Sequence, residues 1–133
     1  MTIFLDTSVF FSLLDADDDR HSLAADVWSR LAGRTETLLT HNYVLVEASA
    51  LIQRRLGVEA MRAFLETIVP LLTVVWVDET MHAAAVGALL TSGKRGLSLV
   101  DCISFEVMRR AGLRVYFAFD AHFAEMGFEA FEG

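Results

Sequence analysis

Short apolar runs alternate along the chain with longer segments in which apolar residues recur every three or four positions. Runs rich in β-branched and aromatic residues are typical of strands, and they occupy residues 2–5, 38–40, 73–77, 115–119 and a last position near 128. Segments with helical spacing lie between them, at residues 7–14, 20–33, 42–56, 58–68, 78–90, 98–112 and briefly after 120. Strands that alternate with helices predict a parallel sheet. We therefore expect an α/β fold with four or five strands and helices on both faces.

Residues that start and stop helices support this division of the chain. Asn42 and Asp78 are placed as N-caps, because their side-chain oxygens can accept hydrogen bonds from unpaired backbone N–H groups. Gly33, Gly57 and Gly112 follow periodic segments and are expected to end them. No repeat or Pro/Ser-rich linker interrupts the pattern, so we expect one domain over residues 1–133.

Composition agrees with a packed domain and suggests a partner. The 133 residues are 54% hydrophobic with a mean hydropathy of +0.44, which excludes a disordered chain. A small domain this apolar is expected to bury part of its surface in an oligomer, and we predict a homodimer. Cys102 is the single cysteine and cannot form an internal disulfide, so we interpret it as a core residue.

The apolar runs are too short for a membrane protein. The longest, residues 68–77, is interrupted by Pro70 and Thr73 and falls well short of the roughly 20 residues that span a bilayer. The N-terminus has no basic region, and Asp6 lies where the apolar stretch of a signal peptide would be. We expect no membrane association and a cytoplasmic location.

The charge balance limits the classes of ligand. A formal net charge of −7 argues against broad electrostatic binding to nucleic acids or anionic membranes. It leaves open a metal-dependent site for phosphates, in which part of the acidity is local. The basic pairs Arg54–Arg55, Lys94–Arg95 and Arg109–Arg110 are interpreted as solvated helix faces.

Three carboxylates are placed by the pattern at one edge of the predicted sheet. Asp6 ends the first strand and Asp120 ends a late one, and ligands of parallel α/β sheets bind where such strands end. Asp101 lies three residues after Ser98, at the start of a helix at the same edge. Helix capping is the alternative for Asp6 and Asp120, and a capping box is the alternative for Ser98 and Asp101.

Glu47 is not explained by capping. Its helix is expected to bury Val44, Ala48, Leu51 and Ile52, so Glu47 falls on or beside the apolar face. A buried carboxylate needs a cation or a hydrogen-bond donor. An arginine and a divalent metal are both open alternatives, and the metal would account for all four acidic residues.

Oxygen ligands alone favour Mg²⁺ or Mn²⁺. Zinc is disfavoured because the four histidines have no paired ligand spacing, and we interpret His122 as structural or merely near the site. The acidic run at residues 15–19 lacks the glycine and the distal glutamate of a calcium loop and is interpreted as a solvated turn.

Taken together, the acidic motifs resemble those of a known family. The motifs are Asp6-Thr7-Ser8, Glu47 at the end of Tyr43-Val44-Leu45-Val46-Glu47, Ser98-Leu99-Val100-Asp101 and Phe119-Asp120-Ala121-His122-Phe123. In this order they resemble a PIN domain, and the small size resembles a VapC-type toxin of a toxin–antitoxin pair. The resemblance covers nearly the whole chain.

The resemblance implies a chemistry and assigns residues to it. It implies a metal-dependent endoribonuclease in which Asp6 and Asp101 are the principal ligands of Mg²⁺ or Mn²⁺. Asp120 and Glu47 would complete the site directly or through water, and Thr7 and Ser98 would support it by hydrogen bonds. The products would carry 5′-phosphate and 3′-hydroxyl ends, and a small cognate antitoxin would cover the site. Lys94 and Arg95 are the basic pair best placed to contact RNA phosphates.

Two alternatives remain within the family: an RNA-processing nuclease that is not a toxin, and a catalytically silent binding module. A receiver-type domain is disfavoured because Thr7 and Ser8 follow Asp6 and no lysine ends a late strand. A dehalogenase-type phosphatase would need an aspartate at the position of Ser8.

Overall fold

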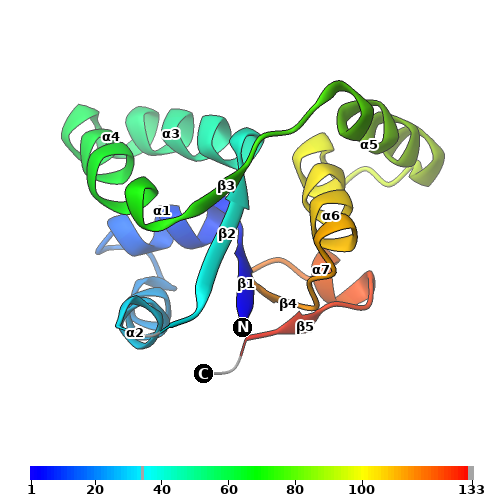
Figure 1. Cartoon of the computed structure of the whole chain (residues 1–133). Coiled ribbons are helices and arrows are strands. Elements are labelled where there is room, and N and C mark those ends of the chain that lie inside the picture. The colour runs from blue at the N-terminus through cyan, green and yellow to red at the C-terminus, as the bar shows by residue number, and fades with distance from the viewer. Residues whose placement is uncertain (34, 132–133) are drawn as a thin grey trace.

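The computed structural model describes residues 1–33 and 35–131, so Arg34 and the last two residues of the expected domain lie outside it. Its centre is one sheet of five parallel strands in the order β3-β2-β1-β4-β5 (Figure 1). The strands are β1 (Thr2–Leu5), β2 (Thr37–His41), β3 (Thr73–Val75), β4 (Val115–Phe117) and β5 (Glu129–Ala130). The prediction of a parallel sheet of four or five strands is confirmed.

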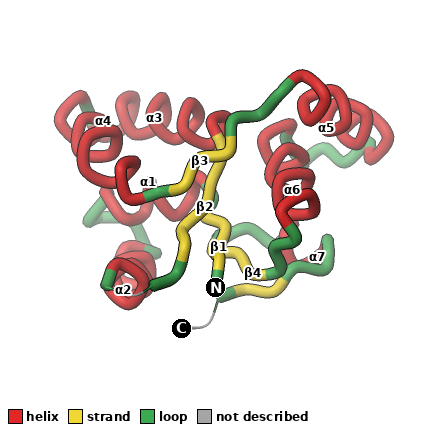
Figure 2. Tube along the Cα trace, in the orientation of Figure 1, coloured by secondary structure: helices red, strands yellow, loops and turns green. Residues whose placement is uncertain are grey.

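Helices lie on both sides of the sheet, as expected. One side carries α1 (Thr7–Leu14), α2 (His21–Ala32), α3 (Asn42–Leu56) and α4 (Val58–Ala63). The other carries α6 (Leu99–Ala111) and α7 (His122–Glu125), with α5 (Glu79–Ser92) packed against α6. Figure 2 shows the strands as a central layer between these two groups of helices. Within the described residues, no helix is long and apolar enough to cross a membrane.

Strand order places a crevice beside β1. From β1 the chain passes to β2 and β3 on one side, and then crosses to β4 and β5 on the other. The connections on the two sides use helices on opposite faces, so the segments that follow β1 and β4 diverge. The carboxyl end of such a pair of strands is where α/β sheets bind ligands. Asp6 directly follows β1, and Asp120 lies in the segment that follows β4.

Several boundaries differ from the prediction. The expected strands 73–77 and 115–119 end earlier, at Val75 and Phe117, so Asp120 lies three residues beyond its strand instead of at its end. The expected helix 58–68 turns into a π-helical segment (Phe64–Ile68) and then a 3₁₀ turn (Val69–Leu71). The π-helical segment has five residues and the 3₁₀ turn three, and such short segments do not show a hydrophobic period of their own.

The helix caps are partly as expected. Asp78 caps α5 by accepting a hydrogen bond from the Met81 backbone N–H at 2.8 Å. Gly57 and Gly112 end their helices with φ angles of 99° and 68°, in the region that favours glycine. The prediction for Asn42 is wrong: His41 is the cap of α3, and Asn42 Oδ1 accepts instead from the Val77 N–H at 2.7 Å.

Aromatic side chains fix the sheet against α6 and α7. Phe123 of α7 is fully buried, with ring centroids 4.8 Å from Tyr116, 5.1 Å from Phe105 and 5.8 Å from Phe4. Phe123 therefore anchors the short helix that follows Asp120. Cys102 is a buried free thiol whose pKa is raised by burial, which confirms it as a core residue.

Candidate metal centre

Asp6 is buried at the start of α1. It lies between β1 and the helix, its side chain is 6% exposed, and its backbone N–H donates to the Phe117 carbonyl of β4 at 3.2 Å. Asp6 occupies the N-cap position, but its side chain makes no capping hydrogen bond. Helix capping therefore does not account for this carboxylate.

Asp101 is oriented by a capping box at the start of α6. Ser98 Oγ accepts from the Asp101 backbone N–H at 3.1 Å, and Asp101 Oδ2 accepts from the Ser98 N–H at 3.0 Å. The capping box is thus present, and it engages one carboxylate oxygen. The other oxygen has no hydrogen-bond partner among the described residues. Capping and metal binding are compatible for Asp101, because they use different atoms.

Asp120 is held by two contacts of its loop. Its Oδ1 accepts from the His122 N–H at 2.7 Å. The preceding residue, Phe119, donates its backbone N–H to Ser8 Oγ of α1 at 3.3 Å. Ser8 therefore joins the loop after β4 to the helix after β1 and brings Asp120 towards Asp6. Sequence reasoning gave Ser8 no structural role, because a hydroxyl that bonds a residue 111 positions away leaves no local pattern.

The three aspartates converge. Asp6, Asp101 and Asp120 each offer a carboxylate oxygen, and these three oxygens lie within 4.8 Å of one another. Their segments are far apart in the sequence and meet at the carboxyl ends of β1 and β4. Within the described ranges, none of the three forms an ion pair with a lysine or arginine. The structure thus brings the predicted acids together, and no lysine or arginine of residues 1–33 and 35–131 pairs with them.

Burial and mutual repulsion make the cluster hard to ionise. Burial, followed by the charge of Asp101, raises the pKa of Asp6 from 3.8 to about 7; the charges of Asp120 and Glu47 add to this, and the Thr7 backbone N–H opposes it. Burial also raises the pKa of Asp120, with a further contribution from Asp101 and opposition from the His122 hydrogen bond. A cation placed among these oxygens would reverse both shifts.

Glu47 differs from the expectation. It is exposed on α3, whereas the buried face of this helix consists of Val44, Ala48 and Ile52. Glu47 follows Val44 by three residues and lies at the edge of that face, so the argument from an unpaired buried carboxylate was wrong. Its charge nevertheless contributes to the raised pKa of Asp6, and it lines a cavity together with Thr7. Glu47 therefore lies at the rim of the cluster, outside the group of three.

Thr7 and the segment 93–98 complete the surroundings. The Thr7 hydroxyl is buried and has no hydrogen-bond partner among the described residues, although an unsatisfied hydroxyl is costly. On the opposite side, His122 Nε2 lies 3.1 Å from the Gly96 carbonyl, which brings the segment with Lys94 and Arg95 near Asp120. Partial burial lowers the pKa of His122, but the Asp120 charge and bonds to Glu125 and Gly96 outweigh it and raise that pKa.

The donor set fits a hard divalent cation. Three carboxylates within 4.8 Å, with oxygens still available, are ligands that Mg²⁺ and Mn²⁺ prefer. Two of them have a carboxylate oxygen fixed by a backbone N–H, which limits their rotation. Asp6, Asp101 and Asp120 could therefore hold such an ion.

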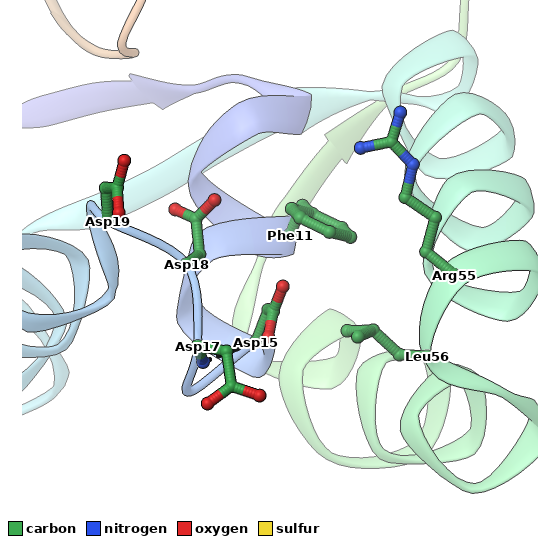
Figure 3. Close-up of a pocket in the computed structure, with 7 residues that line it drawn as sticks. All are labelled: Phe11, Asp15, Asp17, Asp18, Asp19, Arg55 and Leu56. Atoms are coloured by element: carbon green, nitrogen blue, oxygen red, sulfur yellow. Dashed lines mark hydrogen bonds between the residues drawn. The ribbon is translucent and has the colours of Figure 1, made fainter.

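A second acidic group lies elsewhere and is a turn. Asp15, Asp17, Asp18 and Asp19 follow the far end of α1 and line a cavity with Phe11, Arg55 and Leu56 (Figure 3). Asp15 accepts from the Asp17 N–H at 3.0 Å. Asp18 accepts from the Ser12 hydroxyl at 2.7 Å and the Arg20 N–H at 3.1 Å, and the bond from Ser12 lowers its pKa. These hydrogen bonds stabilise the turn itself, in agreement with the interpretation from the sequence.

The doubly wound sheet and the acidic cluster at its switch point define a class of α/β protein with an acidic, oxygen-only candidate metal site. Within this class the chain belongs to the PIN-domain family, whose model matches residues 3–129. It is 36% identical over 129 residues to the 23S rRNA-specific endonuclease VapC20 of Mycobacterium tuberculosis, and the match covers 95% of both chains. This similarity confirms the resemblance to VapC-type toxin ribonucleases.

Solved structures support the same conclusion. The crystal structure of Mycobacterium tuberculosis VapC20, described as a sarcin–ricin loop cleaving toxin, has a TM-score of 0.84 at 34% identity over 95% of both chains. VapBC2 from Rickettsia felis has a TM-score of 0.68 at 11% identity, covering 98% of this chain and 97% of that one. FitAcB from Neisseria gonorrhoeae has a TM-score of 0.69 at 17% identity, covering 99% of this chain and 97% of that one. The last two show that the fold is shared.

Proposed function

We propose that this protein is a Mg²⁺- or Mn²⁺-dependent endoribonuclease and the toxin of a toxin–antitoxin pair. The observation that carries the proposal is the convergence of Asp6, Asp101 and Asp120 from three separate segments, without a basic partner from the described chain. The 36% sequence identity to the endonuclease VapC20 supports the ribonuclease activity. That relative is named as specific for 23S rRNA, and its crystal structure is described as that of a sarcin–ricin loop cleaving toxin. The sarcin–ricin loop is therefore the first substrate to test.

The chain's residues would act by holding and orienting. Asp6 and Asp101 are the proposed principal ligands, with Asp120 and Glu47 completing the site directly or through water. The Ser98 backbone N–H fixes the Asp101 carboxylate, and the Thr7 hydroxyl is available to a carboxylate or a water. A bound divalent cation supplies charge neutralisation at the scissile phosphate and acidifies an attacking water. In-line displacement at that phosphate would leave 5′-phosphate and 3′-hydroxyl ends.

Partners are proposed on the same basis. Lys94 and Arg95 are exposed beside Asp120 and are suited to RNA phosphates, although Lys94 Nζ also lies 4.0 Å from Glu125. A cognate antitoxin is proposed because the similar VapC20 is described as a toxin; that this antitoxin covers the acidic cluster is a prediction. A homodimer remains a prediction, and the large exposed apolar side chains Val46, Trp76 and Leu90 are consistent with it.

The test is cleavage of a hairpin RNA with the sarcin–ricin loop sequence, and of total RNA, in the presence of Mn²⁺ or Mg²⁺. We expect Asp101→Asn to reduce the cleavage rate at least about 100-fold, because one of the clustered carboxylates is lost. EDTA should abolish cleavage by the unchanged protein.

Asp17→Asn is the matched control, since Asp17 belongs to the acidic turn and not to the cluster. Full activity of Asp101→Asn would contradict the proposed site. RNA binding without cleavage by the unchanged protein would favour a silent binding module. Cleavage without growth arrest on expression would favour an RNA-processing nuclease that is not a toxin.

A further inference from the structure

A second cavity adjoins the acidic cluster on the side of α3. Thr7, Glu47, Ala50, Leu51 and Arg54 line this space of about 370 Å³. Two observations place it near the candidate metal centre: Thr7 directly follows Asp6 in the sequence, and the charge of Glu47 contributes to the raised pKa of Asp6. The cavity therefore lies close to Asp6, one of the three clustered carboxylates.

Two polar groups of this cavity have no partner in the described parts of the chain. The Thr7 hydroxyl is buried and makes no hydrogen bond, and a water or ligand is the usual partner of such a group. Arg54 is exposed and forms no ion pair or hydrogen bond, not even with Glu47. Glu47 and Arg54 are seven residues apart, which is about two turns of α3, so they share one face of the helix.

The structure separates two arginines that the sequence presents as a pair. The Arg55 guanidinium lies 5.6 Å from the ring centroid of Phe11 and faces the acidic turn (Figure 3). Arg54 lines the cavity with Thr7 and Glu47 instead. Both arginines are exposed, as expected for a solvated helix face, but they line different cavities.

Arg54 is the positively charged group of this cavity and Glu47 the negatively charged one, so an anion would bind on the Arg54 side. The chain carries a formal −7, and its acidic cluster repels a polyanion. A metal ion offsets this repulsion at one phosphate only, so neighbouring phosphates of a bound strand need cations from the protein. A guanidinium group matches phosphate geometry and can donate two parallel hydrogen bonds to it.

We propose that the cavity lined by Thr7, Glu47 and Arg54 is a phosphate subsite, in which Arg54 holds a non-scissile backbone phosphate of the RNA strand. This rests on the proposed ribonuclease function. With Lys94 and Arg95 on the other side of Asp120, the strand would cross the acidic cluster between two groups of cations. Arg54 is then a binding residue, and its contribution is the same before and during bond cleavage.

The experiment compares Arg54→Gln, Arg54→Lys and Arg55→Gln in single-turnover cleavage of the sarcin–ricin hairpin RNA with Mn²⁺, at several NaCl concentrations. For Arg54→Gln we expect the half-saturating protein concentration to rise about 5- to 10-fold, the maximal rate to stay within about 2-fold, and the salt slope to fall by about 0.7. Arg54→Lys should keep the slope, because it keeps the charge. Arg55→Gln should match the unchanged protein.

The outcomes separate this inference from the proposed function. If the unchanged protein cleaves RNA but Arg54→Gln behaves like Arg55→Gln, the subsite is wrong and the nuclease stands. A lower maximal rate at unchanged half-saturation would place Arg54 at the scissile phosphate, which also overturns the subsite. If the unchanged protein cleaves no RNA with Mn²⁺, both proposals fall. Thermal unfolding of each variant verifies that exposed substitutions on α3 leave the fold intact.

Discussion

At the scale of single residues, the buried carboxyl group of Asp6 destabilises the folded protein when it is ionised. Asp6 is a buried residue, 6% exposed, and its carboxyl group lies with those of Asp101 and Asp120, so burial and the charge of Asp101 raise its pKa to about 7. A carboxyl group with a raised pKa favours the folded state when it is protonated. Its contribution is complete below about pH 4 and is lost as the pH rises through about 7.

The first prediction follows from this shift. In EDTA, Asp6→Asn should become more stable relative to the unchanged protein as the pH rises from about 4 to 7, by up to about 4 kcal/mol, because asparagine has no charge to bury. Urea unfolding at pH 4.5, 6 and 8 measures this difference. Mn²⁺ should stabilise the unchanged protein more than the variant, because the variant binds the ion more weakly.

The comparison must be made between the two proteins, because His41 acts in the opposite direction. Burial lowers the pKa of His41 to about 3, so its contribution to stability is lost as the pH falls from 6.5 towards 3. Both proteins contain His41, and its effect cancels in the difference. If the difference in stability between the unchanged protein and Asp6→Asn did not change with pH, ionisation of Asp6 would not destabilise the folded state.

At the scale of elements, a buried hydrogen-bonded chain joins α3 to α6. The His41 ring accepts from the Val44 N–H through Nδ1 at 3.3 Å, which leaves the proton on Nε2. Nε2 lies 2.9 Å from Ser104 Oγ and donates to it, and Ser104 Oγ donates to the Val100 carbonyl at 3.0 Å. The helix that carries Glu47 is thereby tied to the helix that carries Asp101.

The second prediction concerns this connection. Ser104→Ala should lower the free energy of unfolding by about 1–3 kcal/mol, because it leaves the buried Nε2–H of His41 without an acceptor. Ser49→Ala is the control, since Ser49 makes a comparable bond to a helix carbonyl on the exposed side of α3, and we expect a change within about 0.5 kcal/mol. Urea unfolding at pH 7 measures both. Equal losses of unfolding free energy in the two variants would mean that the buried hydrogen bonds of Ser104 stabilise the protein no more than an exposed hydrogen bond does.

The strands and helices were the features that the sequence predicted best. Periodicity located the five strands and the principal helices, and the strand-end rule placed Asp6, Asp101 and Asp120 at one edge. The spacing of residues tells on which side of a helix a side chain lies, but it does not tell how wide a face of that helix the neighbouring elements bury. For this reason Glu47 was expected to be buried and is exposed. The bond from Phe119 to Ser8 and the cap from His41 depend on tertiary packing, which no local pattern encodes.

At the scale of the whole molecule, an acidic protein must bind an acidic substrate. The net charge of −7 is unfavourable for RNA at long range, so binding depends on local cations and on a metal ion. The exposed residues Lys94 and Arg95 precede α6, and His122 contacts their segment through Gly96. These positive charges lie on the side of the cluster opposite α3.

The third prediction tests this arrangement. Replacing both Lys94 and Arg95 by alanine should weaken RNA binding and reduce the slope of log affinity against log salt by about 1.4, since two phosphate contacts are lost. Fluorescence anisotropy with the Asp101→Asn protein avoids cleavage during the measurement. Arg109→Ala is the control, because Arg109 is exposed near the far end of α6. An unchanged slope in the double variant would remove these residues from the interface.

Titration of the chain with Mn²⁺, followed by the loss of the free-ion electron paramagnetic resonance signal, tests most directly whether the three aspartates form a metal centre. The unchanged protein and Asp17→Asn should bind the ion with the same affinity. Asp6→Asn, Asp101→Asn and Asp120→Asn should each weaken binding at least about 10-fold. Equal affinity in all five proteins, or no binding by the unchanged protein, would contradict the account.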